Sequence, residues 1–365
     1  MIVAIAWACS AVAVAGLLLE VVNLAEFSNL RGGARCEGNV VACVAMRNEA
    51  PNVRGCIASL LGQEQVSAIV LCDDGSTDET FKLMCAAAER EPKIQVVRAA
   101  SDGAGSLRAF GSKSRALAGC AKVAAKMPHT HLFFSDADVR LHNGAITSLL
   151  ALGVERNVEA VSAWPKVIAT SPWDAILAPV LVLFLLQALP LRAVRGRDRR
   201  FAAANGQLFL IDRAAYERCG GHGACPAEVE DVALARALRK AGARIALGNA
   251  AQVASVRGYG SLSSNIRGYG RSLYFGAGPT GTLAFSFWQT CAFVVPWVIL
   301  PFARRPAIAG AVASLTARLL LEARMPISLA GALAVPLSGL CAAYAALASY
   351  LVGKRGEFSW RGRPL

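Results

Sequence analysis

The stretch Leu71–Thr80 reads LCDDGSTDET, in which an apolar run meets two adjacent aspartates, a glycine and a cluster of helix-capping residue types. A short apolar run bounded by turn residues is typical of a buried strand. Gly75 favours a turn after that strand, and Ser76 or Thr77 can cap the helix that follows. The stretch therefore predicts a strand, a turn and a helix, with two like charges at the carboxyl end of the strand.

The same alternation of short apolar runs and helical patterns recurs around this stretch. The other apolar runs cover residues 40–45, 94–98 and 131–134. Short buried strands separated by helices indicate βαβ units and a mostly parallel sheet. The sequence therefore predicts an α/β fold of the Rossmann-like type, in which ligands bind beyond the carboxyl ends of the strands.

Acidic residues follow two of these predicted strands. They are Asp73 and Asp74 after one strand and Asp136 and Asp138 after another. Either pair alone is compatible with an ordinary Asx turn. Crowded carboxylates raise each other's pKa unless a cation or a ligand's hydrogen-bond donors compensate them. Oxygen ligands two residues apart suit Mg²⁺ or Mn²⁺ bridging phosphates, so the pattern predicts a nucleoside diphosphate ligand.

The composition indicates a globular domain attached to a membrane. Of the 365 residues, 55% are hydrophobic and 17% are charged, which is too apolar for an ordinary soluble protein. Residues 1–19, 279–303 and 326–353 carry no charge. We therefore predict an N-terminal transmembrane anchor over residues 1–27, C-terminal transmembrane or re-entrant helices over residues 279–353, and a basic cytoplasmic tail over residues 354–365.

Basic residues border the apolar segments on the side of the central domain, and they include Arg31, Arg35, Arg267, Arg271, Lys354 and Arg355. Positive residues favour the cytoplasmic side, so we predict a multi-pass protein of the cell membrane with a cytoplasmic catalytic domain. The net charge of +13 suits an anionic membrane surface. Basic and aromatic residues do not interleave as they do in nucleic-acid-binding modules, so no nucleic-acid partner is expected.

A further apolar segment, residues 175–191, lies inside the central domain. It contains Pro179 and Pro190 and is followed by a cluster of arginines. A span here would place the two halves of the domain on opposite sides of the membrane. We therefore predict an interfacial segment with its arginines at the lipid headgroups.

Four motifs in order carry a family resemblance: AMRNE at 45–49, CDDGSTD at 72–78, DAD at 136–138 and EDVALAR at 230–236. Together they resemble the inverting family 2 glycosyltransferases of the GT-A fold, over roughly residues 38–275. The similarity is greatest to membrane-anchored bacterial enzymes associated with hopanoid and carotenoid glycosylation, and ceramide glucosyltransferases are more distant relatives.

The resemblance implies a donor site at the strand ends. Ala45, Arg47 and Glu49 would line the nucleotide base and ribose, although the family often has proline before this position. Asp73 and Asp74 would hold a uridine-type base and the ribose, Asp136 would face the ribose or the metal, and Asp138 would bind the metal on the diphosphate.

Lys113 resembles the lysine that reaches toward the diphosphate in this subgroup. A cation beside a helix N-terminus is suited to phosphate, although a solvated surface lysine is the alternative. In the Glu230-Asp231 pair, Asp231 would deprotonate the acceptor hydroxyl and Glu230 would orient it or the acceptor. The alternative for this pair is a favourable interaction with the helix dipole.

Many family members have a Q/R-x-x-R-W motif after the catalytic base. In this sequence the corresponding region, around Arg267 and Arg271, has tyrosine where tryptophan is expected. Both arginines could clamp the diphosphate, or they could serve only as membrane-side positive charges. His222 has no second histidine at ligand spacing and is interpreted as a loop residue on the acceptor side.

We therefore predict a metal-dependent inverting glycosyltransferase that moves a sugar from a nucleoside diphosphate, UDP in the first instance, to a lipid hydroxyl at the cytoplasmic membrane face. Two alternatives remain at this point. One is a processive polysaccharide synthase, and the other is a catalytically inactive membrane-bound module that binds nucleotide sugars.

Overall fold

The computed structural model describes residues 1–33, 36–99, 112–196, 198, 200–360 and 363–364. The chain divides into two compact units. The helical unit comprises Met1–Glu26, Val167–Leu191 and Arg257–Phe358, and the α/β unit comprises Phe27–Lys166, Arg192–Val256 and Ser359–Leu365. Each unit is therefore built from three separate stretches of the sequence.

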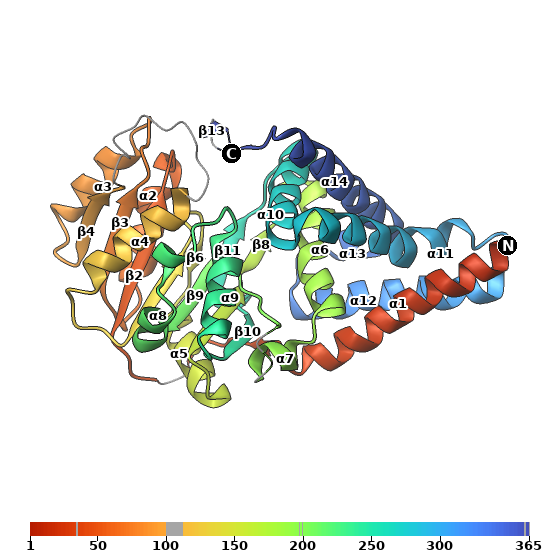
Figure 1. Cartoon of the computed structure of the whole chain (residues 1–365), viewed down its shortest axis with the longest axis horizontal. Helices are drawn as coiled ribbons and strands as arrows, with labels where there is room; N and C mark the ends of the chain where they lie inside the picture. The colour runs from red at the N-terminus through yellow and green to blue at the C-terminus, as the bar shows by residue number, and fades with distance from the viewer. Residues whose placement is uncertain (34–35, 100–111, 197, 199, 361–362, 365) are drawn as a thin grey trace. The chain divides into compact units, whose positions relative to one another are not determined.

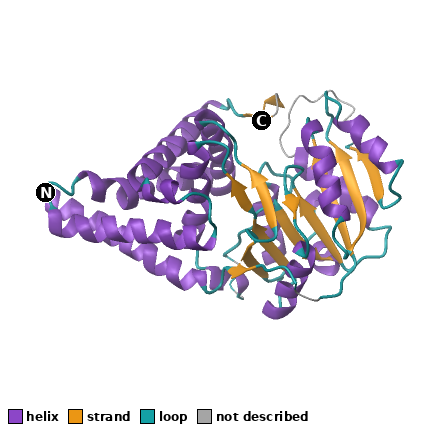
Figure 2. Cartoon of the chain, turned by 180° about the vertical axis from the view of Figure 1, so that it is seen from behind, coloured by secondary structure: helices purple, strands orange, loops and turns teal. Residues whose placement is uncertain are grey.

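Among the described residues, eight strands of the α/β unit form one sheet in the order β1-β10-β7-β9-β5-β2-β3-β4 (Figures 1 and 2). The strands are β1 Ser28–Asn29, β2 Val40–Met46, β3 Val66–Asp73, β4 Ile94–Arg98, β5 His131–Ser135, β7 Ala160–Trp164, β9 Leu208–Asp212 and β10 Ile245–Asn249. Neighbours pair in parallel except at β9, which is antiparallel to both β5 and β7. The predicted α/β class with a mostly parallel sheet is confirmed.

Helices and short strands complete the α/β unit. They are α2 Ala50–Leu61, α3 Thr80–Ala88, α4 Ser112–Ala124, β6 Arg140–Leu141, α5 Ala145–Arg156, α7 Leu191–Arg195, α8 Arg213–Arg218, a 3-10 turn His222–Ala224, α9 Glu230–Lys240, β11 Ala254–Arg257, β12 Ser359–Trp360 and β13 Arg363–Pro364. The sequence predicts a polar loop over residues 99–110, and this stretch lies almost entirely outside the described residues.

The sheet reverses its strand order beside β2. The chain runs outward from β2 through β3 to β4 and returns to the other side of β2 as β5. Val44 of β2 pairs with Ser135 of β5, so the carboxyl ends of these strands are adjacent. In open α/β sheets ligands bind at such a reversal. The fold thus brings the ends of β2, β3 and β5 to one edge.

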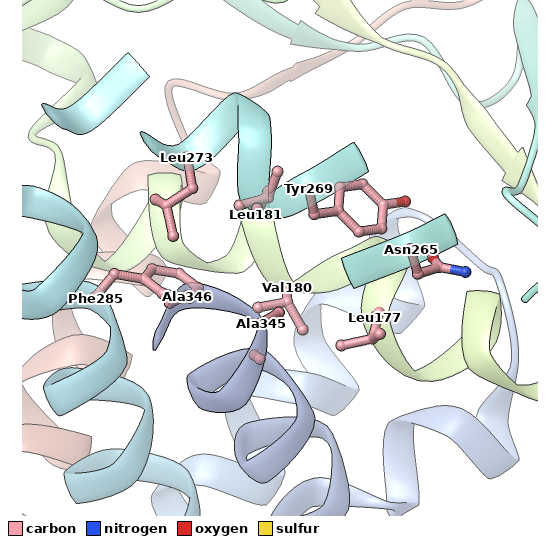
Figure 3. Close-up of a pocket in the computed structure, with 11 residues that line it drawn as sticks. Leu177, Val180, Leu181, Asn265, Tyr269, Leu273, Phe285, Ala345 and Ala346 are labelled. Atoms are coloured by element: carbon pink, nitrogen blue, oxygen red, sulfur yellow. The ribbon is translucent and has the colours of Figure 1, made fainter. Parts of the chain in front are cut away.

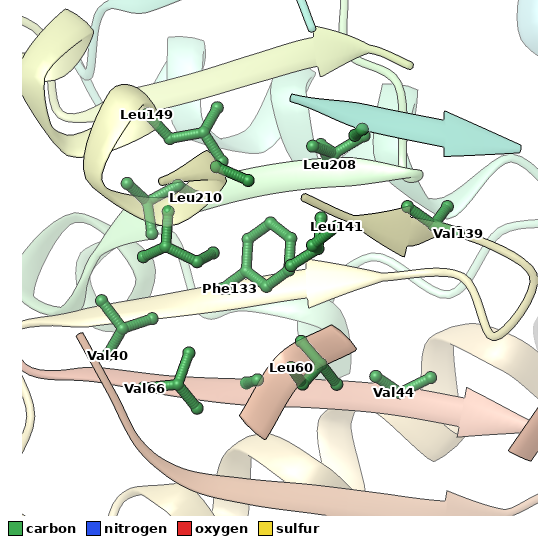
Figure 4. Close-up of a cluster of buried hydrophobic side chains, with 14 of the residues drawn as sticks. Val40, Val44, Leu60, Val66, Phe133, Val139, Leu141, Leu149, Leu208 and Leu210 are labelled. Carbon is green, nitrogen blue, oxygen red and sulfur yellow. The ribbon is translucent and has the colours of Figure 1, made fainter. Parts of the chain in front are cut away.

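The core of the α/β unit lies between the sheet and helices α2 and α5. Figure 4 shows Phe133 surrounded by aliphatic side chains of the sheet and of these helices, including Val40, Val44, Leu60, Leu149, Leu208 and Leu210. Nearly every residue of β2 is buried, as expected for a parallel strand covered on both faces. The strands that end at the acidic turn therefore run through a packed core.

The helical unit contains five long or medium helices and several short ones among the described residues. Its elements are α1 Ile2–Leu24, α6 Pro172–Ala188, α10 Leu262–Gln289, a π-helix Thr290–Val294, α11 Val295–Val298, α12 Arg304–Arg324, α13 Leu329–Leu333 and α14 Val335–Arg355. Strand β8 Lys166–Ile168 contains the boundary between the two units along the chain. Most residues of α6 are buried within the structure. The sequence predicts that this segment lies at the membrane interface, and its position relative to a membrane stays a prediction.

Three described helices, α1, α12 and α14, are long and apolar enough to cross a membrane. The charge-free run 279–303 lies within the C-terminal region predicted to form transmembrane or re-entrant helices. It is divided between the second half of α10, the π-helix and α11. α10 is kinked where Gly278, with φ 75°, precedes Pro279, because proline cannot donate an intrahelical hydrogen bond.

Candidate active site

The turn after β3 accommodates two adjacent aspartates at the end of the strand. Asp73 and Asp74 are both buried. The Asp73 carboxylate accepts a hydrogen bond from the backbone N–H of Ser76 at 3.1 Å, which is an Asx-type turn. The guanidinium of Arg47, at the end of β2, donates to the carbonyl oxygens of Asp74 and Gly75 at 2.7 and 3.0 Å. A buried cation therefore lies against the acidic turn.

The predicted caps at Ser76 and Thr77 are wrong, since α3 begins at Thr80. The Ser76 hydroxyl instead accepts a hydrogen bond from the backbone N–H of Asn48, and the Thr77 backbone N–H donates to the Asn48 side chain. Asn48 has a positive φ of 50°, a conformation that asparagine tolerates. These bonds join the end of β2 to the turn after β3.

Glu49 occupies the N-cap position of α2 and accepts a hydrogen bond from the Asn52 amide at 2.7 Å. Its backbone N–H donates to the hydroxyl of Thr80 at 2.8 Å. Ala45 lies one residue before the end of β2 and pairs with Cys72 of β3. The structure therefore brings Ala45 and Glu49 to the same sheet edge as the acidic turn.

Lys113 lies in the first turn of α4. It forms ion pairs with acidic residues of two sequence motifs, DAD at 136–138 and EDVALAR at 230–236. Its ammonium nitrogen is 2.5 Å from a carboxylate oxygen of Asp136 and 2.5 Å from one of Glu230. Burial alone would lower the pKa of this lysine, but the two carboxylates outweigh it and raise the pKa. Lys113 therefore carries a positive charge at any physiological pH, and it is not the solvated surface lysine of the alternative interpretation.

Asp138 differs from Asp136 in having an unsatisfied oxygen. Its Oδ1 atom is buried and has no hydrogen-bond partner among the described residues. Burial raises the pKa of Asp138 to about 7, the nearby Asp136 and Glu49 add to this rise, and Lys113 opposes it. A buried carboxylate in this state lacks a cation or a donor.

Asp231 begins α9 beside Glu230 and accepts two backbone hydrogen bonds. The N–H of Gly206 donates to its Oδ2 at 2.6 Å, and the N–H of Val232 donates to its Oδ1 at 2.7 Å. Burial raises the pKa of Asp231 to about 7, Glu230 adds to the rise, and Lys113 opposes it. A carboxyl group with this pKa can accept and release a proton near neutral pH.

Gly206 is a site residue that the sequence analysis missed. A Cβ atom at this position would lie 3.1 Å from Glu230 Oε1 and 3.3 Å from Asp231 Cβ. Any larger residue would require the acidic side chains to shift, so glycine favours this close approach of the loop before β9. The Asn-Gly-Gln sequence at 205–207 is a turn signal, but the sequence gives no indication of what the turn contacts.

His222 lies in the protein core and not in a flexible loop. Its Nδ1 atom is 3.0 Å from the hydroxyl of Tyr216, and its ring meets Phe134 edge to face. Burial, with a smaller effect of Lys113, lowers the pKa of His222 to about 3. The imidazole is therefore neutral and packs against Phe134 of β5.

The remaining two predicted residues, Arg267 and Arg271, lie on α10 of the helical unit. The other ten predicted residues all belong to the α/β unit. Gly111, two residues before Lys113, lies outside the described residues.

The acidic residues fit a divalent cation that is held partly by a ligand. Within the described residues, no group of three or more histidine, cysteine or acidic side chains forms a complete metal site. Asp136 and Asp138 nevertheless supply hard oxygen donors two residues apart, and the Asp138 Oδ1 atom is buried without a partner. Mg²⁺ commonly binds through one or two carboxylates plus substrate phosphates, so the donor set suits such an ion.

Comparison with protein families and solved structures agrees with this architecture. A family model described as glycosyltransferase like family 2 matches residues 38–273. The fold is similar to that of the mannosyltransferase PcManGT from Pyrobaculum calidifontis, solved in complex with GDP-Man and Mn²⁺. That match has a TM-score of 0.55 and 18% sequence identity, and it covers 97% of this chain and 100% of the mannosyltransferase.

A second structural match is S. aureus TarS 1–349, with a TM-score of 0.39 and 11% sequence identity over 88% of this chain and 93% of TarS. No curated protein sequence matches significantly. The family match and the first structural match establish the GT-A type of α/β fold for this chain.

Proposed function

The chain belongs to glycosyltransferase family 2 and is a GT-A enzyme that uses a nucleotide sugar, and from this premise we propose that it is metal-dependent and inverting. In our proposal it transfers a sugar from a nucleoside diphosphate to the hydroxyl group of a lipid at the cytoplasmic membrane face. The observation that carries the proposal is the pair of Lys113 ion pairs, which connects Asp136, beside the buried Asp138 oxygen, to Glu230 of the acidic pair at the start of α9.

We propose that the nucleoside binds at the acidic turn. Asp73 and Asp74 would hold the base and ribose, with UDP as our expected donor, and Ala45 and Glu49 would line the same pocket. Arg47 supports this role indirectly, because its guanidinium fixes the carbonyl groups of the turn. The burial and hydrogen bonding of the turn favour a preformed binding surface.

The diphosphate would lie between Lys113 and the Asp136-Ala137-Asp138 segment. A divalent cation, Mg²⁺ or Mn²⁺, held there by Asp138 and Asp136, would stabilise the negative charge that develops on the diphosphate. Lys113 adds a fixed positive charge beside the first turn of α4. We further propose that Arg267 and Arg271 clamp the diphosphate, since a guanidinium pairs with phosphate through two parallel hydrogen bonds.

Asp231 is the proposed catalytic base. Its carboxylate takes the proton of the acceptor hydroxyl while the hydroxyl oxygen forms a bond to the anomeric carbon. The bond from that carbon to the diphosphate breaks, and the nucleoside diphosphate leaves with the bonding electrons. One displacement inverts the anomeric configuration and needs one base. Glu230, paired with Lys113, would hold Asp231 and the acceptor in orientation.

The lipid acceptor and the membrane location are supported by the helical unit. Helices α1, α12 and α14 are apolar enough to span a membrane, and Lys354 and Arg355 lie at the end of α14. Positive residues at this end favour the cytoplasmic side. We therefore propose a multi-pass protein of the cell membrane, in which the α/β unit faces the cytoplasm.

The test is transfer from a panel of radiolabelled UDP- and GDP-sugars into the organic-extractable fraction of membranes that express the chain. Reactions with Mn²⁺ or Mg²⁺ are compared with reactions in EDTA, and membranes carrying Asp231→Asn serve as the control. We expect label in one lipid band that requires the metal and Asp231. The product's anomeric configuration, determined by NMR, should be opposite to that of the donor.

Other outcomes discriminate among the alternatives. Label in insoluble polymer would indicate a processive synthase, and labelled lipid that persists in EDTA would refute metal dependence. Bound nucleotide without any transfer would indicate an inactive binding module.

A further inference from the structure

Polar side chains inside the two units lie in different surroundings. In the helical unit, Asn265 and Tyr269 line a narrow cavity whose other lining residues are apolar (Figure 3). In the α/β unit, Ser135 of β5 and Ser162 of β7 lie in strands whose other buried residues are apolar. Both serine hydroxyls contact the loop before β9, which brings Gly206 to the proposed base. The two serines therefore connect the core of the sheet to that loop.

Ser162 holds both backbone polar groups of Asn205. Its side chain is fully buried. The hydroxyl oxygen accepts a hydrogen bond from the Asn205 N–H at 2.7 Å, and the hydroxyl group donates to the Asn205 carbonyl oxygen at 3.1 Å. A serine hydroxyl can donate one hydrogen bond and accept others, so one side chain satisfies both groups. Asn205 is thereby fixed to β7, although it lies before the first residue of β9.

Ser135 holds the other side of the same loop. Its hydroxyl donates to the carbonyl oxygen of Gln207 at 2.8 Å. Within the loop, the Gln207 N–H donates to the side-chain oxygen of Asn205 at 3.2 Å, and the Asn205 amide donates to the side-chain oxygen of Gln207 at 3.0 Å. Strands β5 and β7 are the two neighbours of β9 in the sheet. The residues before and after Gly206 are therefore fixed from opposite sides.

The group that lies between these two fixed residues is the Gly206 N–H. It donates to Asp231 Oδ2 at 2.6 Å, and a hydrogen bond to a carboxylate favours its ionised form. Glycine has more backbone freedom than other residues, so its N–H keeps one direction only if its neighbours are held. The charged groups that act on Asp231 are Glu230 of α9 and Lys113 of α4, and their effects oppose each other. The hydrogen bond from Gly206 therefore has a clear influence on when Asp231 is ionised.

We propose that Ser162 and Ser135 are positioning residues for the proposed base, because their hydroxyls hold the loop 205–207 so that the Gly206 N–H donates to the Asp231 carboxylate. This inference rests on the proposed function. It extends the site to two serines of the sheet that act through the loop.

The first test measures the ionisation of Asp231 directly. The purified full chain in detergent, with EDTA and without nucleotide sugar, carries aspartate labelled with ¹³C at the side-chain carboxyl group. NMR follows the signal that Asp231→Asn lacks as the pH is varied, and its midpoint in the unmodified chain should be about 7. Ser162→Ala should raise this midpoint by about one pH unit, because a hydrogen bond to a charged group changes the ionisation equilibrium by about tenfold.

The matched control is Ser148→Ala in α5. Ser148 is also buried, and its hydroxyl donates to the carbonyl oxygens of Arg31 and Gly144 at 2.6 and 2.7 Å. This variant removes the same group from the same unit, away from the loop before β9, so the Asp231 midpoint should not move. An unchanged midpoint in Ser162→Ala would overturn the proposal. A lowered midpoint would also overturn it, since the loop would then act by excluding water from Asp231.

A second variant acts through the other serine. Ser135→Ala removes the hydrogen bond to Gln207 and should raise the Asp231 midpoint in the same direction as Ser162→Ala. If Ser162→Ala does not fold, as circular dichroism would reveal, Ser135→Ala decides the question. A raised midpoint would then support the proposal, and an unchanged midpoint would overturn it.

The effect on sugar transfer should depend on pH. At saturating metal and donor, Ser162→Ala should transfer sugar to lipid about tenfold more slowly than the unmodified chain at pH 6, and at nearly the same rate at pH 9. The reason is that a raised midpoint leaves less of the base ionised only at the lower pH. A loss of equal size at both pH values would indicate a general structural disturbance and would overturn the positioning role.

Failure of this inference and failure of the proposed function give different results. If Ser162→Ala shifts the NMR midpoint but transfer survives in Asp231→Asn, the loop does hold Asp231 and the base is another residue. If transfer is lost in Asp231→Asn but Ser162→Ala leaves the NMR midpoint unchanged, only the positioning role is refuted.

Discussion

Each unit contains buried or half-buried aspartates, but their carboxylates have very different sets of hydrogen-bond partners. In the helical unit, Asp174 accepts hydrogen bonds from the Thr170 backbone and hydroxyl, from the backbones of Ser171 and Gly260, and from Asn265. Its pKa is lowered to about 2. In the α/β unit, Asp231 receives two backbone hydrogen bonds and Asp138 has a buried oxygen without a partner among the described residues, and both have a pKa raised to about 7.

The difference separates a structural carboxylate from a reactive one. Asp174 is fully saturated by donors from its own unit, so it stays ionised and joins the start of α6 to the loop before α10. The negative charges of Asp138 and Asp231 are only partly compensated by their hydrogen bonds and by Lys113. Whether each carboxyl group is ionised therefore depends on the ligands that bind beside it. Perturbed pKa values of this kind concentrate at functional sites.

The helical unit also contains a third arrangement, in which buried polar side chains form hydrogen bonds between helices. The amide of Gln187 donates to Glu20 at 2.7 Å, and Arg318 donates to the carbonyl oxygen of Gly331 at 3.1 Å. All three side chains are buried between helices. Polar groups inside an apolar helical bundle usually pair with one another, so these residues are expected to fix helix packing.

The largest expected effect is on the reactive carboxylate. Asp231→Asn keeps the shape of the side chain and removes the base, so sugar transfer should fall by about 10³-fold. Binding of the nucleotide, measured by calorimetry, should change little because the donor contacts proposed above do not include Asp231. Asp198→Asn, at a carboxylate paired with Arg200 near the surface, is the control and should keep full activity. Undiminished transfer by Asp231→Asn would assign the base to another residue.

The structural carboxylate should respond in stability and not in chemistry. Asp174→Asn replaces an acceptor of several hydrogen bonds, and we expect it to lower the free energy of unfolding by about 3 kcal/mol. The exposed Glu357 offers a control, since Glu357→Gln should change stability by less than about 0.5 kcal/mol. Thermal unfolding monitored by circular dichroism would measure both.

The pH dependence sharpens this second prediction. The pKa of Asp174 is depressed, so its stabilisation is fully present above the unfolded-state value of about 3.9 and is lost only as the pH falls toward 2. The difference in stability between Asp174→Asn and the unmodified chain should therefore be the same at pH 6 and pH 8. A difference that shrinks between those values would place Asp174 among the partly compensated carboxylates.

Lys113 tests whether the two reactive aspartates share one compensating charge. It lowers the pKa of both Asp138 and Asp231, so Lys113→Met should raise both. We expect about 30-fold slower transfer at neutral pH, with partial recovery as the pH increases. Lys122→Met, at an exposed position of the same helix, is the matched control. A uniform loss at every pH would mean that Lys113 acts on the diphosphate alone.

Much of the fold follows from the sequence because strand ends are marked by local chemistry. The run 94–98 coincides with β4, and the acidic residues after β3 and β5 do lie at one sheet edge. The helix start after Gly75 was misplaced because Ser76 and Thr77 form long-range hydrogen bonds to Asn48, and a local capping pattern cannot anticipate such partners.

The candidate site was predictable in its residue types and less so in its contacts. The acidic motifs identify Asp138 and Asp231, but the ion pairs of Lys113 and the close approach of Gly206 depend on tertiary packing. Asp174 did carry a signal, since Ser171 and Asp174 have the spacing of a capping box. Its saturation by the loop before α10 is a long-range contact that the spacing does not reveal.

The smallest expected effect is the pH profile of the unmodified enzyme. The raised pKa of about 7 means that Asp231 is protonated at lower pH, where it cannot accept the acceptor's proton. At saturating metal and donor, transfer should therefore fall by about tenfold for each pH unit below 7 and level off above it. Initial rates of lipid labelling between pH 5 and pH 9 would measure this limb.

Asp231→Glu keeps a carboxylate but moves it relative to Gly206 and Glu230, so it should retain an acid limb with a shifted midpoint. A rate that is flat through pH 6 would show that the base is already ionised there, and Asp231 would then resemble the saturated carboxylate of the helical unit.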